Sequence, residues 1–142
     1  METAASAADA IIDEFQFLDD WEEKYQHLIA MGRRLAPLPQ EFMTDAHRLR
    51  GCQSVVHFVA DCRDGVMVYQ ACSDASIVNG LIALLLRVYS GRQPQDVLAT
   101  TPHFLEAIGL DTHLSPTRKN GLAALVGAIM EAARGAVGGE AK

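Results

Sequence analysis

A tight turn between two runs of β-type residues constrains the fold of this chain most. Residues 55–60 read VVHFVA and fit a β-strand of alternating side chains. Residues 66–71 form a second such run, and Arg63-Asp64-Gly65 lies between the two, with a glycine that can adopt positive φ. The sequence therefore predicts an antiparallel β-hairpin in the middle of the chain.

Helical periodicity lies on both sides of the predicted hairpin. Asp19 and Glu22 have the spacing of a capping box at the start of a helix with an aromatic core face. Helices are expected over residues 11–18 and 21–35, from Ser73 or Asp74 to Tyr89, from Pro94, over 102–108, and from Pro116 to about Arg134. This order predicts an α+β fold, a small antiparallel sheet covered by helices.

Length and charge narrow the class of protein. The 142 residues predict a single domain, 1–142, with an ordered core over about 10–134 and flexible ends. The net charge of −6 disfavours a nucleic-acid or anionic-membrane partner. The longest apolar run, residues 81–86, is too short for a bilayer, and the first residues lack a signal-peptide pattern. We therefore expect a cytoplasmic protein without a membrane partner.

The three cysteines are expected to be separate thiols. Cys52, Cys62 and Cys72 lie ten residues apart, which is neither a zinc nor a redox spacing, and a cytoplasmic thiol stays reduced. Cys62 ends a predicted strand and is interpreted as a small buried core residue. Cys72 precedes a predicted helix, whose dipole would favour the thiolate.

Cys52 is the strongest candidate for a reactive thiol. It lies on the loop that enters the first strand, and a loop can carry the sulfur toward a partner. Arg48 and Arg50 precede it, and positive charge would increase the thiolate fraction. Gly51 removes a side chain next to the sulfur, so that a donor could approach closely.

Several short motifs, in the same order along the chain, resemble the SufE family of sulfur acceptors. They are WEEKY at 21–25, GCQS at 51–54, SDA at 73–75 with GLIA at 80–83, PQD at 94–96, and HLSPTR at 113–118 with GL at 121–122. Together they span nearly the whole chain. The resemblance implies an α+β fold of the SufE and IscU type.

The resemblance also implies a function as a persulfide carrier. A SufS- or CsdA-like cysteine desulfurase, which holds its own pyridoxal phosphate, would pass sulfur to Cys52 and be stimulated by it. An iron–sulfur assembly scaffold would then receive the sulfur. This chain would need no cofactor or metal of its own, and an apolar pocket would lie beneath the Cys52 loop.

The same motifs suggest residues that tune the thiol or bind the partner. Besides Arg48, Arg50 and Gly51, these are Gln53, Ser54, Asp74 and Arg118. Arg118 would help to dock the desulfurase, although a solvated arginine in the first turn of a helix is the simpler interpretation. His113 is interpreted as a residue that packs a loop.

The chain departs from the family pattern at four positions. His47 stands where the family usually has asparagine, and His57 where it has tryptophan. Cys72 replaces an acidic residue, and Asn79 replaces a frequent lysine. We expect these changes to affect thiol tuning and the choice of partner rather than the fold.

Two other functions remain open from the sequence. The first is an IscU-like metal or cluster scaffold, with Cys52, Cys72 and one histidine, His47, His57 or His113, as ligands. The second is a binding module that activates a desulfurase without carrying sulfur. The sequence shows neither a nucleophile–base pair nor a nucleotide-binding loop that would indicate an independent enzyme.

Overall fold

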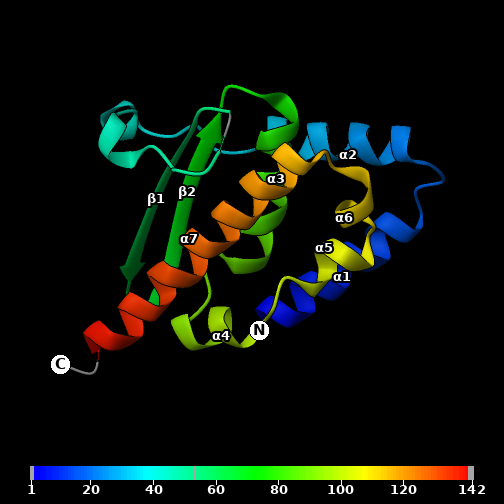
Figure 1. Cartoon of the computed structure of the whole chain (residues 1–142). Helices are drawn as coiled ribbons and strands as arrows, with labels where there is room; N and C mark the ends of the chain where they lie inside the picture. The colour runs from blue at the N-terminus through cyan, green and yellow to red at the C-terminus, as the bar shows by residue number, and fades with distance from the viewer. Residues whose placement is uncertain (1, 53, 141–142) are drawn as a thin grey trace.

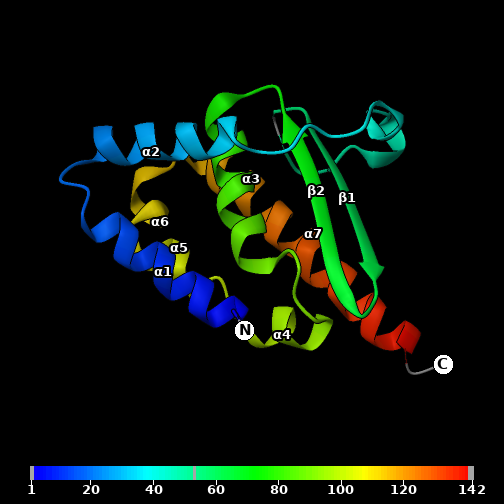
Figure 2. The same ribbon diagram turned by 180° about the vertical axis from the view of Figure 1, so that it is seen from behind.

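The computed structural model describes residues 2–52 and 54–140 and has the α+β architecture that the sequence predicts. Its elements are α1 (Ala4–Gln16), α2 (Trp21–Arg33), the 3-10 turns η1 (Gln40–Phe42) and η2 (Asp45–His47), β1 (Val56–Arg63), β2 (Val66–Ser73), α3 (Ser76–Tyr89), α4 (Pro94–Ala99), α5 (His103–Ala107), α6 (Leu110–His113) and α7 (Pro116–Glu140). Figures 1 and 2 show α3 between the hairpin on one side and α1 and α2 on the other, with α7 lying across it.

The β-hairpin is confirmed. Strands β1 and β2 pair antiparallel, and Arg63 opposite Val66 is the last pair before the turn. Asp64 and Gly65 both have positive φ, 53° and 83°, as a two-residue turn of type I′ requires. One face of the hairpin packs against the core through Val56, Phe58 and Ala60 of β1 and Met67, Tyr69 and Ala71 of β2. The register therefore fixes which side chains face the helices.

Helix α3 is the centre of the hydrophobic core, as its apolar composition predicts. Its buried residues are Gly80, Leu81, Ile82, Leu84, Leu85, Val88 and Tyr89. Gly80 allows α2 to approach, because a Cβ atom at this position would overlap the backbone carbonyl of Leu28. Gly32 of α2 lies against the backbone of Gly80 in the same way. The backbones of α2 and α3 therefore approach closely at the point where Gly32 and Gly80 meet.

Helix α7 covers the hairpin and α3. Leu125, Ile129 and Ala133 on this helix are buried. The hydroxyl of Tyr69 on β2 donates a hydrogen bond of 2.8 Å to the carbonyl of Ile129. Burial, with a smaller effect from the nearby Cys62, raises the pKa of Tyr69 to about 12, so this donor stays protonated. The hairpin and α7 are thus held together beside the Cys52 loop.

The first residues of the chain are helical, although the sequence predicted a frayed end. Helix α1 begins at Ala4, and the side chain of Thr3 caps it in a capping box with Ser6. Ala4, Ala7 and Ala8 are buried. Small residues interpreted as a loose terminus therefore form a close-packed helix face.

Other helix ends also differ from the prediction. The cap of α2 is Asp20 rather than Asp19, and its side chain accepts from the amide of Glu23. Helix α3 begins at Ser76, not at Ser73 or Asp74, because the side-chain amide of Asn79 donates to and accepts from the backbone of Ser73 and holds it outside the helix.

The C-terminal part of the chain contains two more differences. The structure adds α6, a short helix that the sequence pattern did not predict. Helix α7 continues beyond Arg134 to Glu140. Helix α7 begins at Pro116, as predicted, and the hydroxyl of Ser115 accepts from the amide of Arg118 at 3.2 Å.

The length of α7 changes one conclusion about membranes. By length and mean hydropathy, Pro116–Gly138 is sufficient to cross a bilayer, whereas the expectation from the sequence rested on the shorter run at 81–86. Much of this hydropathy comes from alanine and valine spread around the helix. One face packs against the domain through Leu125, Ile129 and Ala133, whereas most of this apolar stretch of α7 is not buried.

Candidate functional site

A cavity of about 360 Å³ lies between the Cys52 loop, α3 and α7. Its apolar lining comes from three elements: Val56 at the start of β1, Val78 and Leu81 on α3, and Leu122 and Leu125 on α7. Each helical pair has a spacing of three residues, which places both side chains on one helix face. The pocket that the family resemblance implied is therefore present beneath the loop.

Cys52 lines this cavity, and its thiol is partly buried. The thiol donates a hydrogen bond of 3.6 Å to the backbone carbonyl of Gly121 on α7. A Cβ atom at Gly121 would lie 3.6 Å from the same sulfur, so the glycine leaves just enough room for the thiol. In this structure the sulfur faces inward, against the helix.

Gly51 brings the loop onto α7. Its φ of 88° lies in the left-handed region, where a side chain is strained. A Cβ atom here would also lie 3.2 Å from the Cβ of Ala124. The glycine before Cys52 is thus required for both the backbone conformation and the close approach.

The pKa of Cys52 differs from the expectation. Burial raises it, whereas Arg48 and Arg50 were expected to lower it. Both arginines are exposed, and Arg48 is joined to His57 by an isolated β-bridge. In this conformation burial and the hydrogen bond to the Gly121 carbonyl favour the protonated thiol, and the expected lowering of its pKa by the two arginines is not seen.

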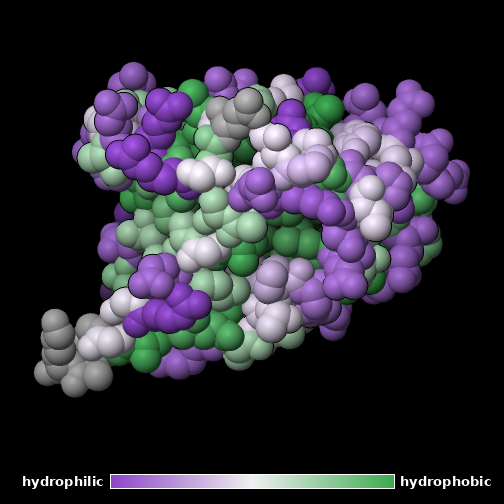
Figure 3. Space-filling model, viewed as in Figure 1, coloured by the Kyte–Doolittle hydropathy of each residue, from purple (hydrophilic) through white to green (hydrophobic). Residues whose placement is uncertain are grey.

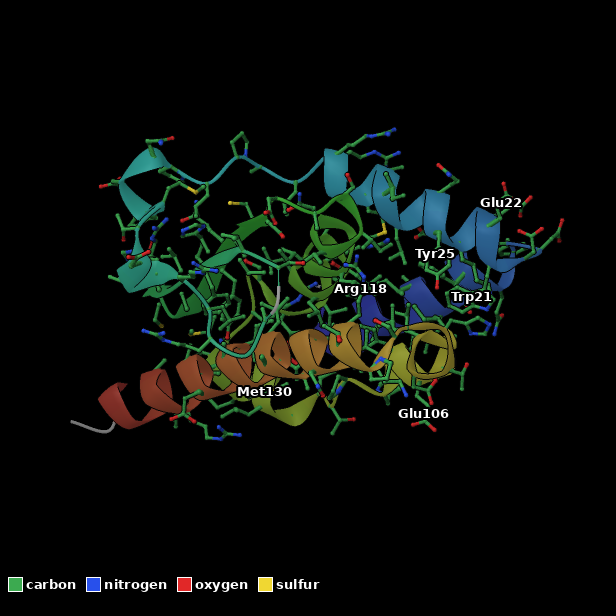
Figure 4. The ribbon with its side chains drawn as sticks, turned by 45° about the horizontal axis from the view of Figure 1, so that its top comes forward. Trp21, Glu22, Tyr25, Glu106, Arg118 and Met130 are labelled. Atoms are coloured by element: carbon green, nitrogen blue, oxygen red, sulfur yellow. The ribbon has the colours of Figure 1, made fainter. Side chains whose placement is uncertain are left out.

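Arg118 is the charged member of the described cavity lining. It lies in the first turn of α7, toward α2, whereas Glu106 on α5 points outward (Figure 4). Its side chain is half-buried, and within residues 2–52 and 54–140 no acceptor is in hydrogen-bond contact with its guanidinium group. Ser54, Ser115 and Thr117 add hydroxyl groups to the same lining.

The end of α6, shortly before α7 begins, is held in place by α2. The ring of His113 stacks on Trp21, with 3.9 Å between centroids and 15° between planes. The hydroxyl of Tyr25 donates to the carbonyl of His113 (Figure 4 labels both α2 residues). The motifs at 21–25 and 113–118 therefore contact each other, and His113 packs this loop as expected.

Cys72 lies on the outer face of the hairpin, away from the cavity. It is opposite His57 on β1, and its thiol contacts the sulfur of Met43 at 3.5 Å. Burial raises its pKa, whereas a helix dipole was expected to favour the thiolate. That expectation is wrong because Cys72 belongs to β2, four residues before α3 begins.

Cys62 was interpreted as a buried core residue, and it is exposed. It lies next to the last residue of β1, opposite the buried Met67. The alternation along β1 places Cys62 on the same face as Val56, Phe58 and Ala60, yet at the end of the strand its side chain is exposed.

The positions that depart from the family pattern do not line the cavity. The ring of His47 contacts Thr44 and Phe42, and His57 is on the outer face of the hairpin with Cys72. Asn79 closes the turn between β2 and α3. These residues therefore lie outside the described lining of the cavity.

The remaining site predictions have mixed outcomes. Ser54 lines the cavity. Asp74 is exposed and accepts from the hydroxyl of Ser73 at 3.4 Å, so it is a surface residue. Gln53 lies outside the described residues. The sequence did not single out the apolar lining residues Val78, Leu81, Leu122 and Leu125, because a spacing of three residues is also that of an ordinary helix core face.

The metal-scaffold hypothesis finds no ligand set in the described part of the chain. There, no three His, Cys, Asp or Glu side chains come together as metal ligands. Cys52 faces α7 and Cys72 faces Met43, on opposite faces of the hairpin. His47, His57 and His113 have the other contacts described above.

The fold and site define a small α+β domain with a loop thiol above an apolar cavity. A family model described as "SufE: Fe-S metabolism associated domain" matches residues 9–133. The chain belongs to the SufE family, which associates it with iron–sulfur metabolism and supports a role in sulfur transfer.

Curated relatives cover most of the chain. A SufE-like protein of Rhizobium meliloti is 35% identical over 92% of this chain and 96% of its own length. One of Rhizobium etli is 38% identical over 91% and 90%. One of Synechocystis sp. is 40% identical over 78% and 70%.

A solved structure is similar to the whole fold. The solution structure of a hypothetical protein from Thermus thermophilus superimposes with a TM-score of 0.78. It is 24% identical and covers 96% of this chain and 98% of its own. At this identity the similarity supports the α+β fold.

Proposed function

We propose that this protein accepts sulfur from the persulfide of a cysteine desulfurase onto Cys52 and passes it on for iron–sulfur cluster assembly. The observation that carries the proposal is the thiol of Cys52 on a loop, held above an apolar cavity. A persulfide formed there would be partly shielded from water by the apolar lining. SufE-family membership supports the same role.

The transfer step needs only a thiolate and access. The thiolate of Cys52 attacks the outer sulfur of the donor persulfide, a new S–S bond forms, and the donor cysteine leaves as its thiolate. The electrons and the single transferred sulfur balance without an added oxidant. The desulfurase supplies pyridoxal phosphate, so this chain contributes a nucleophile and no cofactor.

The resting geometry implies a rearrangement before transfer. Burial raises the pKa of Cys52, and its thiol donates to the carbonyl of Gly121. Turning the loop outward would release the sulfur from both effects and restore an ordinary thiol pKa. We propose that docking of the desulfurase drives this opening, with Arg118 and the exposed Arg48 and Arg50 on the docking side, in the cytoplasm.

Intact-mass measurement tests the acceptor role. The protein is mixed with a SufS- or CsdA-like desulfurase and free cysteine, and we expect one sulfur atom to be added to Cys52. The matched variants are Cys52→Ser and Cys72→Ser, because both replace a partly buried thiol. Cys72→Ser should load as the unmodified protein does, and Cys52→Ser should not load.

The alternative functions give different results. A binding module that only activates the desulfurase would stimulate it equally well with Cys52→Ser. Sulfur found on Cys62 or Cys72, with Cys52 unmodified, would contradict the assignment.

A further inference from the structure

The cavity beneath Cys52 is larger than a transferred sulfur atom needs. Its volume of about 360 Å³ lies within the range of roughly 300–1,000 Å³ typical of small-molecule sites. One water molecule occupies about 30 Å³ in the liquid, and a sulfur atom is of similar size. Most of the space would therefore remain available beside a persulfide on Cys52.

The lining has the polarity of a site for an amphipathic anion. Val56, Val78, Leu81, Leu122 and Leu125 supply the apolar part. Arg118 supplies a positive charge, and in the described part of the chain its guanidinium group has no carboxylate partner. A guanidinium group binds a carboxylate through two parallel hydrogen bonds, and the binding is stronger where water is partly excluded.

We propose that this cavity binds a low-molecular-weight thiol that carries a carboxylate, and that this thiol accepts sulfur from Cys52. This inference rests on the proposed function. Arg118 would hold the carboxylate, the apolar residues would contact the carbon chain, and the thiol would meet the sulfur of Cys52 in the same cavity. The protein would then deliver sulfur to small acceptors as well as to proteins.

The transfer step is balanced without another reagent. The thiolate of the small acceptor attacks the outer sulfur of the Cys52 persulfide, Cys52–S–SH. A sulfur–sulfur bond to the acceptor forms as the bond to Cys52 breaks. Cys52 leaves with the electron pair as a thiolate, and the proton of the persulfide stays on the transferred sulfur. The carbonyl of Gly121 is then available to the reprotonated thiol.

The test compares small thiols of similar size and different charge. Cys62→Ser with Cys72→Ser provides a background in which Cys52 is the cysteine that remains. Cys52 is loaded with inorganic polysulfide, its persulfide is verified by intact mass, and excess polysulfide is removed. Mercaptopropionate, mercaptoethanol or cysteamine is then added, and loss of the persulfide is followed. Each rate is divided by the rate of the same thiol with a small disulfide, which corrects for intrinsic reactivity.

We expect mercaptopropionate to exceed mercaptoethanol by about tenfold after this correction, the effect of one good charge-assisted contact. The mercaptopropionate rate should saturate with concentration, because the acceptor binds before it reacts. In Arg118→Gln the ratio should fall to about one, and Arg118→Lys should keep part of it. Lys119→Gln is the matched control, since Lys119 is the exposed neighbour outside the cavity, and it should keep the full ratio.

A ratio near one in the unmodified protein, or a ratio that survives in Arg118→Gln, would overturn the inference. The outcome is separable from that of the proposed function, because polysulfide loads Cys52 without a desulfurase. If no desulfurase can load Cys52 but the polysulfide-loaded protein still prefers mercaptopropionate, the proposed function is overturned and the acceptor site in the cavity is not.

Discussion

Cys52 and Cys72 are both partly buried, and burial raises the pKa of both, yet their surroundings differ. Cys52 lies above an open cavity with a guanidinium group in its lining. The sulfur of Cys72 contacts the thioether of Met43, on the other face of the hairpin. The direction of the pKa shift therefore does not distinguish the proposed carrier thiol, Cys52, from Cys72, whereas the space beside the sulfur does.

The surfaces around the two thiols also differ. In Figure 3, a hydrophobic region extends over the middle of the visible face, along α7 and toward the hairpin, with hydrophilic atoms around it. Several residues of α7 that are not buried are small or apolar, such as Ala123, Val126 and Gly127. Helices α3 and α7 pack against the hairpin on its inner face, and on the outer face Cys72 contacts Met43, next to η1.

The largest expected effect is on stability and compares α7, which packs against the inner face of the hairpin, with the outer face of the hairpin. Leu125→Ala removes a buried side chain between the cavity and the core and should cost about 2–5 kcal/mol of unfolding free energy. Val68→Ala, on the half-buried outer face, should cost about 1 kcal/mol or less. Urea unfolding measures both, and equal losses would contradict the distinction between the faces.

The next effect compares two glycines with positive φ. Gly51→Ala and Gly65→Ala each force a side chain into the left-handed region, which costs about 1–2 kcal/mol. Only Gly51 is close to α7, because no atom lies within 4 Å of a Cβ at Gly65. We expect both to lose stability and only Gly51→Ala to load sulfur more slowly, by intact mass over time. Normal loading in Gly51→Ala would show that the loop position is not important.

A smaller effect tests what covers Cys72. Met43→Ala removes the thioether that contacts the Cys72 thiol, and Met43 is 40% exposed, so stability should change by less than about 1 kcal/mol. Alkylation of Cys72 by iodoacetamide should become several-fold faster, and that of Cys52 should not change. Peptide mass mapping resolves the two sites, and a faster Cys52 would mean that the two regions are coupled.

The smallest effect is the dependence of stability on pH. Burial raises the folded-state pKa of Cys52, so the unfolded chain loses this proton first as the pH rises. The contribution of the protonated Cys52 thiol to the free energy of unfolding is complete below the unfolded thiol pKa of about 8.5. It decreases as the pH rises toward the folded pKa. The difference in unfolding free energy between the unmodified protein and Cys52→Ser should therefore change with pH only in alkaline solution. A difference that grows below neutral pH would contradict the direction of the shift.

Much of the fold could be predicted because its signals are local. The alternation of residues 55–60 and the Asp64-Gly65 turn specify the hairpin, and Ser115-Pro116 specifies the start of α7. The predicted frayed end was wrong because the small residues of α1 gain their stability from packing, which no local signal reports. The start of α3 was misplaced because the side chain of Asn79 competes for the backbone of Ser73.

The site divides in the same way. The residues themselves singled out Cys52 as a loop thiol with a glycine before it, and the family motifs indicated its chemistry. Its pKa was predicted in the wrong direction, because charges adjacent in sequence, Arg48 and Arg50, are exposed to solvent while α7 buries the sulfur. Burial depends on segments distant in the chain, so neighbours in sequence could not reveal it.

The order of residues was thus enough to specify an α+β domain of the SufE family with a thiol on the loop before a hairpin. Packing in three dimensions was needed to bring Cys52 and Arg118 to one cavity and to place Cys72 on the opposite face. Secondary structure follows from side-chain spacing and backbone preference along the chain, whereas a cavity exists only where separate elements pack and leave space between them.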